Sequence, residues 1–362
     1  MGWNKIKILD LYIIKKFLGS FAGVIALVIL MVVVVDAAEN IQEFLDSEAS
    51  FWEIALGYYG NFVPYFVNLL SPLFVFIAVI YFTSKLSRNT EIIAMLNTGM
   101  SFYRLMIPYI VSAVVIGMLS FYLTNFLIPQ TNKGLMEFKE RYISRQVRNR
   151  NIDCHIKISA NGYVFVKYWE HSTGKGYDFS YEEMGQQGVK YKLYASTIEW
   201  DTVENHWIMN DYVKRHYNGI FETIETGKKM DTVLNFSLSD FIIVKEGYSM
   251  MSYTAIREYI EEEKSKGSEA KDYEYEKHRR IAFPFATIIL SLVGLCVSSR
   301  KSRQGIGLHL LLGLLITFSF VMLMQIAQVF AILGGFSPFW AAWTPNIAYS
   351  ILCIFLIIKT PK

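Results

Sequence analysis

The chain of 362 residues is more apolar than a soluble protein of this length. Hydrophobic residues make up 53% and charged residues only 19%, against about a quarter charged in soluble domains, and the mean hydropathy is +0.29. This composition indicates that lipid forms part of its solvent. A net charge of +3 is too small to indicate a nucleic-acid partner, and three cysteines exclude a disulfide framework.

Six segments are predicted to cross a bilayer, because a hydrocarbon core about 30 Å thick takes roughly 20 helical residues. They are Phe17–Val35, Asn61–Thr83, Leu105–Ile128, Ile281–Ser299, Gly305–Leu333 and Trp343–Ile358. The last two belong to one run without Asp, Glu, Lys or Arg, which Gly334–Pro338 interrupts with turn-forming residues. The first is too long for a signal peptide, so we expect it to be a retained span. Polar residues within spans are expected to form hydrogen bonds between helices; they are Asn68, Gln325 and Gln328.

Basic residues in the short loops predict the orientation of the chain. They lie in the N-terminal segment, after the second and fourth spans and at the C-terminus: Lys5, Lys7, Lys15, Lys16, Lys85, Arg88, Arg104, Arg300, Lys301, Arg303, Lys359 and Lys362. The opposite loop, Ala37–Tyr59, has acidic residues and neither Lys nor Arg. We therefore expect both termini in the cytoplasm and the long loop on the outer side.

The long outer segment, residues 129–280, is long enough for one domain. Runs rich in Tyr, Val, Ile and Trp, separated by turn residues, predict five strands: Cys154–Ser159, Gly162–Glu170, Lys190–Trp200, His206–Tyr217 and Phe221–Thr226. Many short strands favour a sandwich, a jelly roll or a barrel, and flanking helices are predicted at Lys133–Arg148 and Tyr253–Lys266. The expected fold class is membrane α-helical, with six transmembrane helices in two halves (1–128 and 281–362) and an inserted all-β, jelly-roll-like domain.

The loop between the second and third spans predicts a short helix at about residues 88–100. Asn89 or Thr90 can cap it, Glu91 suits the positive end of its dipole, and Gly99 ends it. Its apolar surface consists of Ile92, Ile93, Met95 and Leu96. Such a helix either lies on lipid headgroups or binds a groove on a cytoplasmic partner, and the pattern alone leaves both open.

Basic residues also gather where the outer segment meets the spans, and they suit a phosphorylated lipid headgroup. They are Lys133, Lys139, Arg141, Arg145, Arg148 and Arg150 after the third span, and Lys277, His278, Arg279 and Arg280 before the fourth. The headgroup candidates among them are Lys133, Arg141, Arg279 and Arg280. The alternative is that they extend to ordinary phospholipid or pair with acidic neighbours such as Glu276 at helical spacing.

No catalytic or metal-binding motif is present in the sequence. It lacks a Gly-x-x-x-x-Gly-Lys-Ser/Thr loop, so we expect ATP hydrolysis in a separate subunit. Cys154-His155 lacks the second pair of a structural zinc site, and we expect no cofactor. The competing hypotheses are a membrane-tethered binding or scaffold protein that acts through its β domain, and a membrane-embedded enzyme, which would need paired carboxylates or a His/Asp set at lipid depth.

Several short motifs, in this order along the chain, resemble the LptF/LptG family of lipopolysaccharide-export permeases. They are Asp10-x-Tyr12-x-x-Lys15; Thr90–Met95 with Gly99-Met100-Ser101, Arg104 and Pro108; Glu276–Ser299 with Arg280, Pro284 and Gly294 before Arg300; Arg303-Gln304-Gly305; and Trp343-x-Pro345-Asn346. Each motif is weak alone, but together they are specific and cover essentially the whole chain.

The resemblance implies an inner-membrane permease subunit of an ABC transporter that passes lipopolysaccharide to a periplasmic bridge of jelly-roll domains. Implied partners are a cytoplasmic ATPase dimer, a paralogous LptF- or LptG-type permease in a heterodimer, and a bridge protein similar to LptC or LptA. Lipid is expected to enter between spans one and five. Expected contacts with the ATPase are Glu91, Ile92, Met95, Leu96, Gly99 and Arg104. A permease for a different lipid is the alternative.

Overall fold

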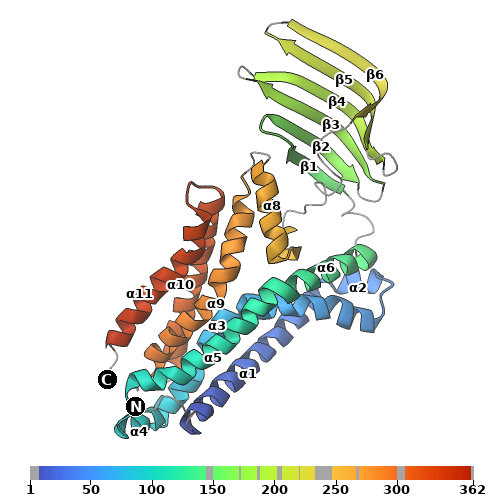
Figure 1. The fold of residues 1–362 in the computed structure, drawn as a ribbon. Helices are drawn as coiled ribbons and strands as arrows, with labels where there is room; N and C mark the ends of the chain where they lie inside the picture. Colours follow the sequence, from blue (N-terminus) through green and yellow to red (C-terminus); the bar gives the residue numbers. More distant parts are fainter. Residues whose placement is uncertain are drawn as a thin grey trace. The chain divides into compact units, whose positions relative to one another are not determined.

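The computed structural model describes residues 8–143, 150–170, 173–185, 188–201, 206–219, 221–232, 247–265, 269–299 and 306–359. The chain divides into two compact units (Figure 1). The helical unit comprises Met1–Leu135, Met250–Ile256 and Lys271–Lys362, and the sheet unit comprises Met136–Ser249 and Arg257–Ala270. Some residues singled out in the sequence lie outside the described residues; they are Lys5, Lys7, Arg145, Arg148, Arg300, Lys301, Arg303, Gln304, Gly305 and Lys362.

Six helices long and apolar enough to cross a membrane occur in the described part of the chain, which confirms the six predicted spans. They are α1 (Ile8–Glu39), η1 with α3 (Glu53–Tyr59 and Gly60–Arg88), α5 with η2, α6 and η3 (Phe102–Tyr122, Leu123–Leu127, Ile128–Phe138 and Lys139–Ile143), α9 (Lys271–Ser298), α10 (Ile306–Ile332) and α11 (Pro338–Lys359). The shorter helices are α2 (Ile41–Asp46), α4 (Glu91–Asn97), η4 (Gly247–Met250) and α8 (Tyr253–Ser265).

Several spanning helices begin earlier than hydropathy predicts. Helix α1 starts at Ile8 rather than Phe17, and α9 starts at Lys271 rather than Ile281. Each extension contains a carboxylate in an ion pair: Asp10 binds Arg104, and Glu276 binds Arg280. Hydropathy predicts only the apolar part of a spanning helix. The helix itself can extend beyond that part where its polar side chains have partners.

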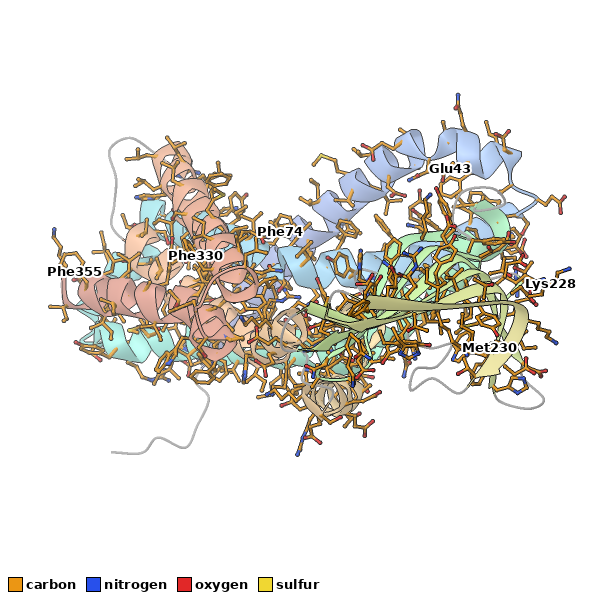
Figure 2. All side chains as sticks on the ribbon, turned by 90° about the horizontal axis from the view of Figure 1, so that it is seen from above. Glu43, Phe74, Lys228, Met230, Phe330 and Phe355 are labelled. Carbon is orange, nitrogen blue, oxygen red and sulfur yellow. The ribbon has the colours of Figure 1, made fainter. Side chains whose placement is uncertain are left out.

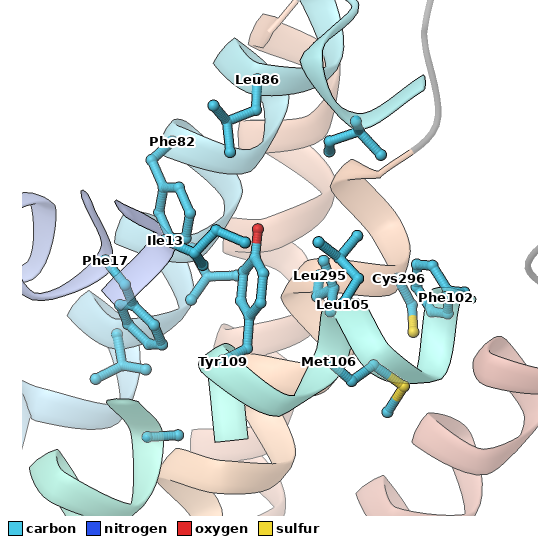
Figure 3. Close-up of a cluster of buried hydrophobic side chains, with 14 of the residues drawn as sticks. Ile13, Phe17, Phe82, Leu86, Phe102, Leu105, Met106, Tyr109, Leu295 and Cys296 are labelled. Carbon is cyan, nitrogen blue, oxygen red and sulfur yellow. The ribbon is translucent and has the colours of Figure 1, made fainter. Parts of the chain in front are cut away.

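The core of the helical unit joins α1, α3, α4, α5 and α9. In Figure 3, Phe17 of α1 lies beside Phe82 of α3, with ring centroids 5.6 Å apart, and Phe82 stacks on Tyr109 of α5 at 5.3 Å. Helices α5 and α9 approach closely at Gly117, where an added Cβ would lie 3.2 Å from the carbonyl oxygen of Pro284. Small residues allow such close packing between spanning helices.

Large apolar side chains cover the outside of the helical unit. Phe330 of α10 and Phe355 of α11 are exposed (Figure 2), as are Leu30 of α1 and Phe318 of α10. By contrast, Phe74 of α3 is buried. An exposed apolar surface of this kind marks contact with lipid or with another membrane protein.

The sheet unit confirms the predicted β domain. Its described strands form one antiparallel sheet in the order of the sequence: β1 (Arg150–Lys157), β2 (Gly162–Glu170), β3 (Lys175–Gly185), β4 (Gly188–Asp201), β5 (His206–Asn218) and β6 (Phe221–Thr232). Trp169, Phe179 and Trp207 are fully buried in its core.

Strand β3 is missing from the five strands predicted from the sequence. Its Asp178, Glu182 and Glu183 belong to residue types that are depleted in strands. Pairing with both neighbours overrides this preference, because Phe179 lies opposite Val166 of β2 and Ala195 of β4, and all three side chains are buried.

Candidate functional site

The short helix after α3 begins without the predicted side-chain cap. Thr90 adopts a left-handed conformation, with φ of 61°, and its hydroxyl donates to the carbonyl oxygen of Asn89 rather than capping α4. Gly99, at φ of +84°, turns the chain after α4 as expected, because glycine adopts this conformation without steric cost. The hydroxyl of Ser101 then accepts a hydrogen bond from the backbone N–H of Arg104 and starts α5. We call residues 88–104 the coupling segment.

The apolar side of α4 faces the core, which corrects the expectation that it forms an outer surface. Ile92 is only 2% exposed and belongs to the cluster with Ile13, Leu86 and Phe102, while Met95 and Leu96 pack against that cluster. These three residues share one helical face by their spacing of three and four. The opposite side presents Ile93, Ala94 and Asn97, and Ile93 is 42% exposed.

Polar side chains fasten the coupling segment to the start of α1. The Tyr12 hydroxyl donates to Oε2 of Glu91 at 3.0 Å, across 79 positions of sequence. The Arg104 guanidinium donates from Nη1 and Nη2 to the two oxygens of Asp10, at 2.8 and 2.5 Å. We call these four residues the α1 clamp. The sequence placed them in two separate motifs, and the structure brings them together.

A second cluster of charges lies within α9. Arg279 donates two hydrogen bonds to Glu276, at 2.7 and 3.1 Å. Arg280 donates from Nε to Oε1 of Glu276 at 3.0 Å and from Nη1 to the carbonyl oxygen of Met251 at 2.8 Å. One carboxylate therefore serves two guanidinium groups, so the three side chains carry a net charge of +1.

This cluster corrects the headgroup prediction for Arg280. Its side chain is 2% exposed and its charge is directed at Glu276, so it acts as a structural ion, as the pairing alternative predicts. Arg279 keeps 27% of its side chain exposed and can face a ligand. Lys133 on α6 and Arg141 in η3 are also exposed.

Two of the polar contacts between helices join α3 to other spans. Asn68 of α3 donates to Thr124 at 2.9 Å, which confirms its predicted role, whereas Gln325 is exposed. His309 of α10 lies 2.9 Å from the hydroxyl of Ser84 in α3, and both are buried. Sequence reasoning did not single out His309, although one ionisable residue in an otherwise uncharged run is a signal.

No group of three or more His, Cys, Asp or Glu side chains in the described ranges could hold a metal ion. In a comparison with protein-family models, residues 11–359 match the model described as lipopolysaccharide export system permease LptF/LptG. The matched range contains the coupling segment and the Glu276 cluster. No curated protein matches the chain.

Proposed function

This chain belongs to the LptF/LptG family of lipopolysaccharide export permeases, and on that premise we propose that it extracts lipopolysaccharide from the inner membrane with energy from a separate ATPase. Family membership makes it a multi-pass component of a membrane transporter that works with other Lpt proteins, not an enzyme. Beyond family membership, we propose the source of energy, the orientation of the chain in the membrane and the surfaces that contact its partners.

The coupling segment is the observation that carries the proposal. Its apolar face is anchored on the ends of α1, α3 and α5, and its other face presents Ile93, Ala94 and Asn97. A short helix held in this way can enter a groove on a cytoplasmic protein and transmit a push to several spans. An unanchored helix lying on lipid headgroups would instead present its apolar face outward.

The proposed orientation places the coupling segment and both termini in the cytoplasm and the sheet unit in the periplasm. Lys85 and Arg88 lie in the last turn of α3, and Lys359 lies in the last turn of α11. Helix α2 and the residues after it carry Glu43, Asp46 and Glu48. Basic residues favour the cytoplasmic side of a membrane.

The surfaces of α1 and α10 support lipid entry beside these helices and pairing with a paralogous permease. The most apolar stretch of α1 contains no buried residue, and Leu30 of α1 and Phe318 of α10 are exposed. These surfaces suit acyl chains or a partner's helices. Arg279 supplies a partly exposed guanidinium for a phosphorylated headgroup.

Docking of a periplasmic bridge protein is proposed at β6. This strand is the last in the described sheet, pairs with β5, and has mostly exposed side chains, including Phe221 and Ile224. An extended segment of another chain can add to such an edge through backbone hydrogen bonds.

Affinity purification from the native membrane tests the proposal. The tagged wild-type chain is expected to bring down an ATPase and a second permease of six spans, and Glu91→Ala is expected to lose the ATPase. Tyr12→Phe is the matched control, because it removes the hydrogen bond to Glu91 but keeps the carboxylate, so the ATPase should stay bound. If neither partner co-purifies in mild detergent, the tethered-scaffold alternative replaces this proposal.

A further inference from the structure

The buried attachments of α1 are concentrated at one end. Its buried residues are Asp10, Ile13 and Phe17, all near its start. Beyond them, large residues such as Leu27 and Met31 are exposed. At the far end, the Tyr58 hydroxyl contacts Asp36 at the longer distance of 3.3 Å. The position of α1 therefore depends chiefly on what its first turns contact.

These first turns contact the coupling segment in two layers. Ile13 and Phe17 lie in the same apolar cluster as Ile92 of α4 and Phe102 of α5. Above this layer, the α1 clamp adds a bidentate ion pair and a hydrogen bond to a carboxylate. Both are charge-assisted, and the Asp10 side chain is only 11% exposed, which screens the pair from water.

We propose that Asp10, Tyr12 and Arg104 are positioning residues that make α1 and the coupling segment move as one body. When the ATPase displaces the coupling segment, the α1 clamp transmits the displacement to α1 and alters the lipid-facing surface of that helix. This inference rests on the proposed function. Arg104 then acts through Asp10, and not through a contact with the ATPase.

Loss of the α1 clamp should have a different effect from loss of a contact with substrate or nucleotide. Asp10 and Arg104 are bound to each other, and their removal leaves Ile93, Ala94 and Asn97 free to engage the ATPase. A complex without this ion pair should therefore assemble and hydrolyse ATP while moving less lipid for each ATP consumed. The ratio of lipid extracted to ATP hydrolysed is the decisive readout.

The first experiment uses the complete complex in proteoliposomes that contain purified lipopolysaccharide. Asp10→Arg and Arg104→Asp are each expected to lower this ratio by about tenfold, within the usual range of coupling between sites. The double exchange restores an ion pair of opposite direction and should recover most of the ratio. Arg257→Ala is the control, because it breaks the exposed pair with Glu261 in α8 and should change nothing.

A covalent replacement tests the same inference without relying on the exchanged ion pair. The background carries Cys154→Ser, and the native Cys296 and Cys353 can remain because they are buried. In this background, the double variant Asp10→Cys with Arg104→Cys should hydrolyse ATP but extract little lipid. A short bis-maleimide that joins the two cysteines should then restore lipid extraction.

Two outcomes would overturn this inference but not the proposed function. One is that the single variants keep the wild-type ratio of lipid extracted to ATP hydrolysed. The other is that the cross-link blocks extraction, since α1 would then have to separate from the coupling segment. A wild-type complex that binds no ATPase, or extracts no lipopolysaccharide, would overturn the proposed function itself.

Discussion

The hydroxyl of Ser84 in α3 lies 2.9 Å from Nδ1 of His309 in α10, and both side chains are buried. Replacing either residue leaves the other without its partner in an apolar interior, which costs free energy of unfolding. A double-mutant cycle of Ser84→Ala and His309→Phe should give a coupling of about 1 kcal/mol, typical of hydrogen bonds between spanning helices. Thermal unfolding in detergent measures it, and a pair without mutual contact, Ser84→Ala with Ser112→Ala, should be additive.

The two arginines that share Glu276 should respond differently to replacement. Arg280→Ala removes a fully buried partner and should destabilise the chain by about 3 kcal/mol. Arg279→Ala should cost about 1 kcal/mol or less, because its side chain is partly exposed, and it should weaken lipopolysaccharide binding. Thermal unfolding and lipid binding in detergent separate the two effects. Equal unfolding temperatures for both variants would contradict the structural role of Arg280.

Neighbouring isoleucines of α4 should likewise separate stability from partner binding. Ile92→Ala opens a cavity in the core and should cost about 2 to 5 kcal/mol of the free energy of unfolding. Ile93→Ala should leave the unfolding temperature nearly unchanged but lower the amount of ATPase that co-purifies. A normal ATPase yield with Ile93→Ala would show that this face of α4 does not contact the ATPase.

Gly117 tests the close approach of α5 and α9. A leucine at this position would place its Cβ 3.2 Å from the backbone oxygen of Pro284, and a backbone atom cannot move aside as the end of a side chain can. We expect Gly117→Leu to destabilise the chain by about 1 to 3 kcal/mol. Gly23→Leu in α1 is the control, because nothing lies within 4 Å of an added Cβ there. Unfolding of both variants in detergent compares them.

Much of the fold could be predicted because it depends on local patterns. The six spans follow from apolar length, and four of the predicted strands match β2, β4, β5 and β6 closely at their first residues. Strand β3 could not be predicted in this way, because it is held by pairing on both sides and not by its composition. The start of α1 was missed for a similar reason, since Asp10 is stabilised by a residue 94 positions away.

The candidate site was likewise predictable only in part from the sequence. Sequence motifs singled out Asp10, Tyr12, Glu91 and Arg104, but they gave no reason to join them. Periodicity indicated that Ile92, Met95 and Leu96 share one face of a helix, but not whether that face meets a partner or the chain's own core. Spacing also allowed Arg280 to bind either a headgroup or Glu276.

The sequence by itself determined the number of spanning helices, the inserted β domain and the family. These are properties of local composition and of motifs in order. Only the tertiary structure decided which side of α4 is outward, which arginine beside Glu276 is buried, and that the coupling segment is bound to α1. The physical reason is that a charge or an apolar face has no fixed partner until folding brings distant segments within a few ångströms, where hydrogen bonds and burial act.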